Sequence, residues 1–502
     1  MTLPSSAVVA QFSVSPLLED ALKKLLDRQE GNQKAADYYE GRAGEVFASP
    51  QLRRVMRNTG IDYQFNFAKT PVDALTDRLE IATVKSSDAA ADAAIKVMWA
   101  VNELDLEVPQ MHRRAGEFGD AYVIVWPNDV DRPVVEGEDP DEVSYQAEDV
   151  GIYYNSADTV MLFYAAERPL EKSHAIKRWR TEDKRWRVDL LFDHHIERYI
   201  SAKDAKGERA QDFEPLVLDY EFVEGEDGEL EELPIWPAEN PFGEVPVFHL
   251  RNDRPYGSPE HKGFYGPQDA ITKLIIGHMS GVDYNSAPQR YALIDAESDT
   301  AEAADLDPDD FDSALGFTED EKNAEARGEG DSQFSSAPGS LWLMRGVKGV
   351  GQFDNADPKT FLEPLERYLR LGGQITSTPL RMFDYENSQL PSGASQSQAD
   401  GPFVKKVRNR QLSYGATWQD VYGFALRILG IEHADVQVLW APPNVVDDEA
   451  GWSVIKMKLE AGVPYEQVMR EAGYLADLVD EWVKQRAEQK NEPAPESQDR
   501  AS

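Results

Sequence analysis

The sequence predicts an α+β fold that is mostly helical. Apolar residues recur at helical spacing near the N-terminus and through the second half of the chain. Between roughly residues 120 and 250, short β-branched and aromatic runs separated by turn residues predict strands. With 502 residues, of which 41% are hydrophobic and 28% charged, the chain is long enough for two or three domains with sizeable cores.

The N-terminal part is expected to be helical, with one turn. Leucines on one side of the first segment give it an amphipathic period, and Gly119 ends the last segment. The tyrosine-rich run Tyr38–Arg42 is expected to be the turn. By their apolar spacing, the helices cover 17–33, 69–79, 89–102 and 111–118.

The next part is expected to form an antiparallel sheet, because turn clusters separate its strands. The acidic, glycine-containing stretch 224–232 is expected to be a solvated loop. The predicted strands cover 121–126, 160–165, 176–180, 187–192, 196–200 and 245–250.

Two amphipathic helices, at 267–282 and 361–375, flank a different kind of segment in the second half. Residues 295–336 are acidic and poor in apolar anchors, so we expect them to be mobile or ordered by a partner. Short ordered segments are expected at 340–343 and 350–353.

Residues 378–401 form a long loop of small and polar residues, which inside a compact domain is typically functional or disordered. A long helix at 403–429 follows, with Gly415 and Gly423 as expected kink points. The chain is then expected to end in a disordered tail, after short helices at 448–461, 464–472 and 475–489.

The composition excludes several classes of protein. The net charge of −39, from 52 Lys and Arg against 91 Asp and Glu, excludes a protein that binds nucleic acid by a broad basic surface. The absence of cysteine excludes disulfides, thiolate metal sites and cysteine nucleophiles. The N-terminal residues lack the pattern of a signal peptide, and no run approaches the roughly 20 apolar residues of a membrane span. We therefore expect a soluble, intracellular protein without a membrane partner.

No motif in the sequence predicts catalysis. The phosphate-loop pattern GxxxxGK[ST] is absent, and GVKGVG at 346–351 is better explained as a turn. The run SGASQS at 392–397 lacks the GxSxG setting of a serine nucleophile. We predict no catalytic residue and no cofactor.

Metal binding is not predicted either. The alternating acids of 305–309 resemble the start of an EF-hand loop, but Asp310 and Gly316 occupy the positions at which that loop needs Gly and Glu. His194 and His195 are adjacent in a strand-like run, so they point to opposite faces and cannot easily share one metal.

Basic residues form two local groups, one at 53–57 and one at 405–410. Each group is either a solvated or subunit-bridging face, or a local contact with DNA or a neighbour. Both interpretations stay open from the sequence.

Several short segments occur in a characteristic order. They are YYEGR (38–42), TPVDALTDRLEI (70–81), GDAYVIVWP (119–127), NPFGEVPVFHLRN (240–252), PQDAITKLI (267–275), APQRYAL (287–293), LRLGGQITSTPLRMF (369–383), FVKKVRNRQLSYGATWQDVYGFALRI (403–428) and KLEAGVPYEQVMREAGY (458–474). In this order they resemble the phage portal proteins of the siphovirus family typified by the SPP1 portal, over residues 35–480. The chain departs from that family at the start of the long helix, where Gly401 and Pro402 replace a Gly-Ser/Glu-rich run.

The resemblance implies a ring-forming portal fold with wing, stem, clip and crown. The first stem helix and its exit would lie in the segments 267–275 and 287–293. The implied parts are an N-terminal helical arm (1–35), an α+β wing (36–252), a stem helix (253–287), a clip (288–355), a second stem helix (356–378), a tunnel loop (379–401), a long helix with a return to the wing (402–444), a crown (445–487) and a disordered tail (488–502).

The resemblance also implies a function without enzymatic activity. The chain would form a ring of 12 copies at one capsid vertex, through which double-stranded DNA passes during packaging and ejection. Its partners would be the terminase large subunit of the packaging motor, a head–tail adaptor of the connector, and the major capsid and scaffolding proteins. It would be located in the virion, and in the host cytoplasm during assembly.

The expected tunnel loop, 379–401, suits a surface past which DNA moves, because it is long, small in its side chains and free of lysine. A conduit should bind DNA weakly, since each neutralised phosphate adds salt-sensitive affinity, and an acidic chain meets that need. A disordered surface loop is the alternative. The residues expected to face DNA are Arg381, Gln389, Ser392, Gly393, Ser395, Gln398, Lys405 and Lys406.

Two other functions remain open. One is a head–tail adaptor or a minor capsid structural protein. The other is an acidic hydrolase or nuclease with paired carboxylates, although such pairs arise by chance among 91 acidic residues.

Overall fold

The structure, a computed structural model, describes residues 13–42, 65–128, 145–224, 230–253, 255–286, 290–294, 341–345, 349–352, 359–383, 400–443 and 448–472, together with 479, 482–484 and 486. The chain divides into two compact units. Unit 1 comprises Met1–Gly44, Asn66–Tyr265 and Gly372–Ser502, and unit 2 comprises Glu45–Phe65 and Gly266–Leu371. Most of unit 2 is thus one excursion of the chain between two parts of unit 1.

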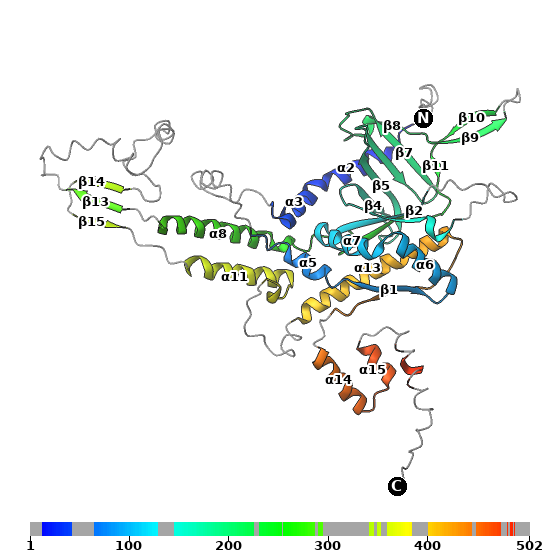
Figure 1. Cartoon of the computed structure of the whole chain (residues 1–502). Coiled ribbons are helices and arrows are strands. Elements are labelled where there is room, and N and C mark those ends of the chain that lie inside the picture. Colours follow the sequence, from blue (N-terminus) through cyan, green and yellow to red (C-terminus); the bar gives the residue numbers. More distant parts are fainter. Residues whose placement is uncertain are drawn as a thin grey trace, which may run out of the picture. The chain divides into compact units, whose positions relative to one another are not determined.

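The fold is α+β, as the sequence predicts, and Figure 1 labels its elements. The described helices are α2 (Pro16–Asp27), α3 (Gln29–Glu40), α5 (Thr70–Thr76), α6 (Ala89–Val101), α7 (Leu104–Phe118), α8 (Tyr265–Ser286), α11 (Lys359–Thr376), α13 (Gly401–Ile428), α14 (Asp448–Glu460) and α15 (Tyr465–Glu471). The short 3₁₀ turns are η1 (Ala147–Asp149), η2 (Ala210–Asp212), η3 (Lys262–Phe264) and η4 (Leu380–Met382).

The sheets of unit 1 are antiparallel, as predicted, because short turns join most of their strands. A larger sheet has the order β11-β7-β6-β5-β4, with β8 pairing β7, and a smaller sheet has the order β12-β2-β3. Their strands are β2 (Asp120–Pro127), β3 (Val150–Asn155), β4 (Val160–Tyr164), β5 (Lys172–Arg180), β6 (Trp186–Leu191), β7 (His195–Ser201), β8 (Phe213–Pro215), β11 (Ala238–Glu239) and β12 (Val247–Arg251).

Two strands that are distant in sequence form a separate two-stranded sheet in unit 1. Strand β1 (Ile81–Ser86) pairs antiparallel with β16 (Val436–Trp440). The sequence analysis missed both strands, and it missed β3. The pairing that stabilises β1 and β16 joins residues far apart in sequence, so it is visible only in three dimensions.

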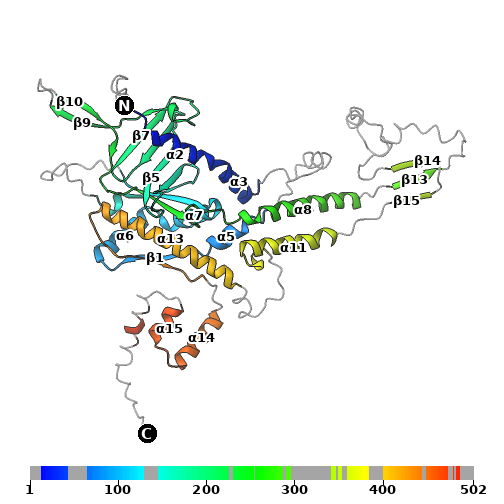
Figure 2. The same cartoon turned by 180° about the vertical axis from the view of Figure 1, so that it is seen from behind.

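The N-terminal arm, residues 13–42, differs from the prediction. The expected single helix is two helices, α2 and α3, which meet at Arg28. The expected turn at Tyr38–Arg42 is wrong up to Glu40, because α3 continues to that residue and ends only where Gly41 adopts a left-handed φ of 77°. Both views place α2 over the larger sheet of unit 1, where it contacts β5, and α3 contacts α7 (Figures 1 and 2).

Helix α13 forms the centre of the unit 1 core. It packs against β12, β2, β16 and α6, and it is a single helix that includes both expected kink points, Gly415 and Gly423. Trp418 is fully buried, and its indole N–H donates to His112 Nε2 at 3.0 Å. His112 Nδ1 lies 2.9 Å from the carbonyl oxygen of Leu79, so that ring is held between α13 and the end of α5.

Unit 2 contains the described part of α8 from Gly266, that of α11 up to Leu371, and a small sheet. In this sheet β13 (Arg290–Ile294) is central, parallel to β14 (Leu341–Arg345) and antiparallel to β15 (Gly349–Gln352). Helix α8 ends at Ser286, and strand β13 begins at Arg290 within 287–293, the segment expected at the exit of the first stem helix. The acidic insertion 295–336 lies outside the described residues.

Two further segments refine the prediction. The stretch 224–232, expected to be loop, includes the ends of a hairpin formed by β9 (Asp219–Glu224) and β10 (Leu230–Ile235). Near the C-terminus, α14 and α15 pack through Ile455, Val468 and Met469. These helices match those predicted at 448–461 and 464–472.

Candidate functional site

The candidate site is the base of the loop between α11 and α13, where the sequence places its DNA-facing residues. Helix α11 ends at Thr376, the turn η4 and Phe383 follow, and α13 begins after Asp400. We call residues 376–383 and 400–410 the loop base. The middle of the loop is outside the described residues, and with it Gln389, Ser392, Gly393, Ser395 and Gln398.

The two ends of the loop are fastened to one another and to the core. Arg381 forms an ion pair with Asp400, which joins the segment that leads into the loop to the segment that follows it. The Phe383 ring stacks on Phe264, with ring centroids 5.4 Å apart. Gly401 and Pro402 form the first turn of α13, a position that proline favours because its missing N–H would have no helical partner.

A buried ion triad lies beneath this base. Glu260 accepts from Lys406 Nζ at 2.6 Å through Oε2 and from Arg410 Nη2 at 2.6 Å through Oε1, and its side chain is 5% exposed. Burial alone would raise the pKa of Glu260, but the two cations outweigh that effect and lower it. Lys406 Nζ also donates to the carbonyl oxygen of Thr376 at 3.0 Å, which ties α13 to the end of α11.

The positive charges expected to face DNA therefore have different surroundings. Arg381 and Lys406 are engaged with Asp400 and Glu260, whereas Lys405 is exposed on the first turns of α13. The sequence placed Lys405 and Lys406 correctly at the start of the long helix. It missed Glu260, because a lone glutamate between two predicted elements carries no pattern.

A segment between β12 and α8, residues 252–261, supports the triad, and we call it the connector. Asn252 Nδ2 donates to Ser258 O at 2.7 Å and to Glu260 Oε1 at 3.1 Å. Gly257 lies so close to Gly119 that a Cβ there would be 1.8 Å from the Gly119 carbonyl oxygen. Only glycine fits that approach, so the path of the connector is fixed against the start of β2.

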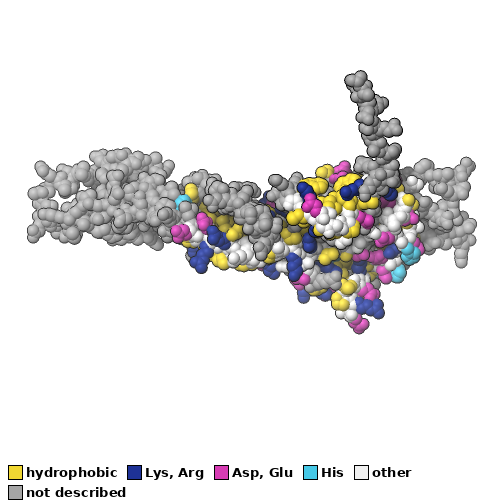
Figure 3. All heavy atoms as spheres, turned by 90° about the horizontal axis from the view of Figure 1, so that it is seen from below, with side chains coloured by type: hydrophobic (Ala, Val, Ile, Leu, Met, Phe, Trp, Pro, Cys, Tyr) yellow, Lys and Arg dark blue, Asp and Glu magenta, His cyan; other side chains and the backbone are white. Residues whose placement is uncertain are grey.

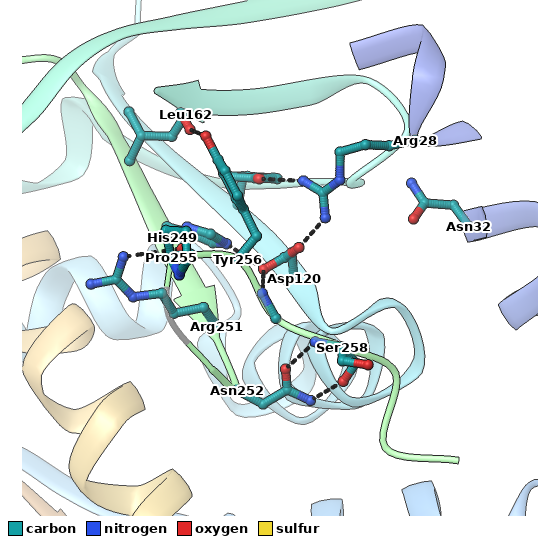
Figure 4. A network of polar contacts seen from close by, with 12 residues as sticks. Arg28, Asn32, Asp120, Leu162, His249, Arg251, Asn252, Pro255, Tyr256 and Ser258 are labelled. Carbon is teal, nitrogen blue, oxygen red and sulfur yellow. Dashed lines mark hydrogen bonds and ion pairs between the residues drawn. The ribbon is translucent and has the colours of Figure 1, made fainter. Parts of the chain in front are cut away.

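The connector also reaches a buried carboxylate, shown in Figure 4. Asp120 accepts from the Gly257 N–H at 2.7 Å and from His249 Nε2 at 2.7 Å, and it forms an ion pair with Arg28 of the arm. Burial alone would raise the pKa of Asp120, but the contacts with His249, Arg28 and Gly257 lower it. Burial lowers the pKa of His249.

The surface of the described part is mixed in charge. On the face drawn in Figure 3, Lys and Arg side chains alternate with Asp and Glu and with hydrophobic side chains, and no continuous basic patch covers the coloured atoms. This agrees with the net charge of −39. Such a face offers few sites for simultaneous phosphate contacts.

The charged side chains of this site are paired with one another and join its segments. Within the described ranges, no group of three or more His, Asp or Glu side chains is placed to hold a metal ion. Helices in that same part of the chain include none that is long and apolar enough to cross a membrane. The buried charges of the site are paired with one another, which suits a rigid joint.

Comparisons with known proteins give a limited result. No protein-family model matches the sequence, and no curated protein matches it. Similar solved structures include a chain from the virion of a native gene transfer agent particle, with 10% identity and a TM-score of 0.41 over 89% of this chain and 99% of that one. A chain from the neck of a native gene transfer agent particle, computed with C12 symmetry, has 11% identity and a TM-score of 0.41, and covers 86% of this chain and 95% of that one. At these scores the neighbours assign no function to this chain.

Proposed function

We propose that the protein is a portal, a ring of identical subunits through which double-stranded DNA enters and leaves a capsid. The ring would have 12 copies and would bind a terminase motor and a head–tail connector. It would perform no covalent chemistry. The loop at 384–399 would line the channel.

One observation carries the proposal, and it is the path of the chain. The chain leaves unit 1 through α8, forms the small sheet β13–β15, and returns through α11 directly into the loop and α13. Helix, insertion, helix, loop and long helix is the order that the resemblance to portal proteins implies. A head–tail adaptor or minor capsid protein remains the second candidate, but nothing in the described residues favours it.

The loop base fits this proposal physically. A channel loop must flex while its two ends stay in place, and here both ends are fixed by the Arg381–Asp400 pair and by the triad around Glu260. Because Arg381 and Lys406 are paired with carboxylates, they add little net attraction for passing phosphates. Lys405 is exposed and can touch DNA weakly.

Ring formation is the first test. Negative-stain images and light scattering of the purified full chain should show closed rings with a central hole wide enough for B-DNA. A strictly monomeric species across a wide concentration range would refute the proposal. A nuclease or ATPase activity that survives repurification and is abolished by a point change in the chain would favour the hydrolase alternative.

The role of the loop has a test of its own. Replacing Gln389, Ser392, Ser395 and Gln398 together by Lys should add phosphate contacts, and each contact should steepen the salt dependence of DNA association by about one unit of slope. Packaging should then slow at low salt while rings persist. The matched control places four Lys on the exposed face of α14. Unaffected packaging at low salt would mean that the loop does not line the channel.

The insertion is expected to bind the motor or connector. Deleting residues 300–332 should leave rings intact and abolish motor or adaptor binding, because this acidic stretch has few apolar anchors of its own. Normal binding by the deletion variant would contradict that role.

A further inference from the structure

Polar contacts with buried groups hold the N-terminal arm to the rest of unit 1. Arg28, at the junction of α2 and α3, pairs with Asp120, and its Nη1 donates to the Tyr122 hydroxyl at 3.2 Å. Further along, Asn32 Nδ2 donates to Asp158 Oδ1 at 2.8 Å. His261 Nε2 lies 2.9 Å from the carbonyl oxygen of Ala35 and donates to it.

The carboxylate of Asp120 binds both the arm and the connector. Its side chain is fully buried, one oxygen binds Arg28, and the other accepts the Gly257 N–H and His249. If Arg28 leaves, a buried anion loses its principal countercharge. The remaining donors, Gly257 N–H and His249, must then adjust or the site must admit water, so the connector is the first segment affected.

The contacts of the connector lead from Gly257 to the loop base. Glu260 lies three residues after Gly257, and its carboxylate holds both Lys406 and Arg410. Asn252 links the two ends of the connector through Ser258 and Glu260. From Glu260 the chain of contacts continues through Lys406 to the Thr376 carbonyl oxygen at the loop base.

We infer that the connector couples the N-terminal arm to the loop base, so that the state of the arm determines how firmly both ends of the loop are held. A ligand or neighbouring subunit that displaces Arg28 from Asp120 would loosen the loop base, and one that fixes the arm would tighten it. This inference goes beyond the portal proposal and holds whether or not the chain forms rings. Its physical basis is that Asp120 and Glu260, two buried carboxylates, hold the two ends of one short backbone segment, residues 257–260, and each binds cations of a distant element.

The test is amide hydrogen exchange of the full chain, measured by mass spectrometry on three sets of peptides. These cover the arm, the loop base, and α7 as a core reporter. Arg28→Met should speed exchange at the loop base about fivefold or more, the lower end of usual coupling between sites, while α7 stays protected. Glu260→Gln should have a similar effect on the loop base.

The matched control is Arg187→Met. Arg187 pairs with Asp189 at 3.2 Å, and its side chain is 24% exposed against 20% for Arg28, but it has no contact with the connector among the described residues. This variant should leave the loop base at the wild-type rate. All variants are compared in the same assembly state.

The double variant Arg28→Met with Glu260→Gln decides the matter. Coupling predicts that its effect on the loop base is smaller than the product of the two single effects, because both changes break one path. The inference is overturned if Arg28→Met speeds exchange in the arm but leaves the exchange rate of the loop base unchanged. It is also overturned if the double variant speeds exchange at the loop base by the product of the two single effects. If α7 loses protection in Arg28→Met, the milder variant Arg28→Lys keeps a cation near Asp120 but loses the guanidinium that binds Asp120 and Tyr122 together, and the same outcomes apply to it.

Discussion

The environment of His112 gives a prediction about the stability of unit 1 that can be worked out in numbers. This side chain is fully buried and accepts the Trp418 N–H at 3.0 Å through Nε2. Nδ1 must then carry the proton and donate to the Leu79 carbonyl oxygen, so the ring is neutral. Burial lowers the pKa of His112 to about 4 from its ordinary value of 6.5.

The sign of the pH effect follows from this lowered pKa. Below pH 6.5 the unfolded chain binds a proton at His112 that the folded chain refuses until pH is near 4. The stabilising contribution is therefore complete above pH 6.5 and is lost as pH falls toward 4. At pH 5 the loss amounts to about 2 kcal/mol, because each pH unit below the unfolded pKa is worth about 1.4 kcal/mol.

The perturbation is His112→Gln, which keeps a donor and an acceptor. At pH 7 we expect it to lower the free energy of unfolding by about 1–3 kcal/mol, because its amide cannot satisfy both buried partners with ideal geometry. At pH 5 the same substitution should cost about 2 kcal/mol less than at pH 7, since the variant lacks the titrating group.

The assay is urea unfolding of both proteins at pH 7 and pH 5, followed by tryptophan fluorescence. The difference between wild type and variant cancels the carboxylates that also titrate in this range. A cost of His112→Gln that is equal at the two pH values would refute the reasoning, because it would mean that the folded protein binds the proton as readily as the unfolded chain.

Three other predictions concern the site. Glu260→Gln should destabilise unit 1 by about 3–5 kcal/mol in urea unfolding, because it leaves two largely buried cations without their countercharge. Replacing all three members of the triad with Met should change the free energy of unfolding little, and an equal loss for both variants would contradict this reasoning. Gly257→Ala should lower the free energy of unfolding by about 1–3 kcal/mol, since its Cβ meets the Gly119 carbonyl oxygen. The control Gly31→Ala, with open space around the added methyl group, should leave that free energy unchanged or raise it slightly. An unchanged free energy in Gly257→Ala would mean that the connector is not fixed there. Phe383→Ala should leave the free energy of global unfolding almost unchanged and increase proteolytic cleavage between residues 384 and 399, because it removes the stacking on Phe264. Cleavage at the wild-type rate would show that this contact does not hold the end of the loop.

Part of the candidate site was predictable from local pattern alone. The helical period around Leu369 and Phe403 located α11 and α13 and so defined the loop between them, and the basic group at 405–410 was correctly placed at the start of the second helix. The partner of these cations was not predictable, because Glu260 lies 150 positions from Arg410. A periodic pattern shows which face of an element is buried, but it does not show which other element covers that face.

By itself the sequence determined the α+β class, the antiparallel middle part, the end of α7 at Gly119 and the exclusion of all cysteine chemistry. These depend on backbone preferences and on spacing along the chain, which act over a few residues. Only the tertiary structure decided that β1 pairs with β16, that Arg28 pairs with Asp120, and that Glu260 of the connector binds the cations of the loop base. Each of these contacts joins residues far apart in sequence, and the stabilisation of a buried charge depends on the partner that folding brings to it.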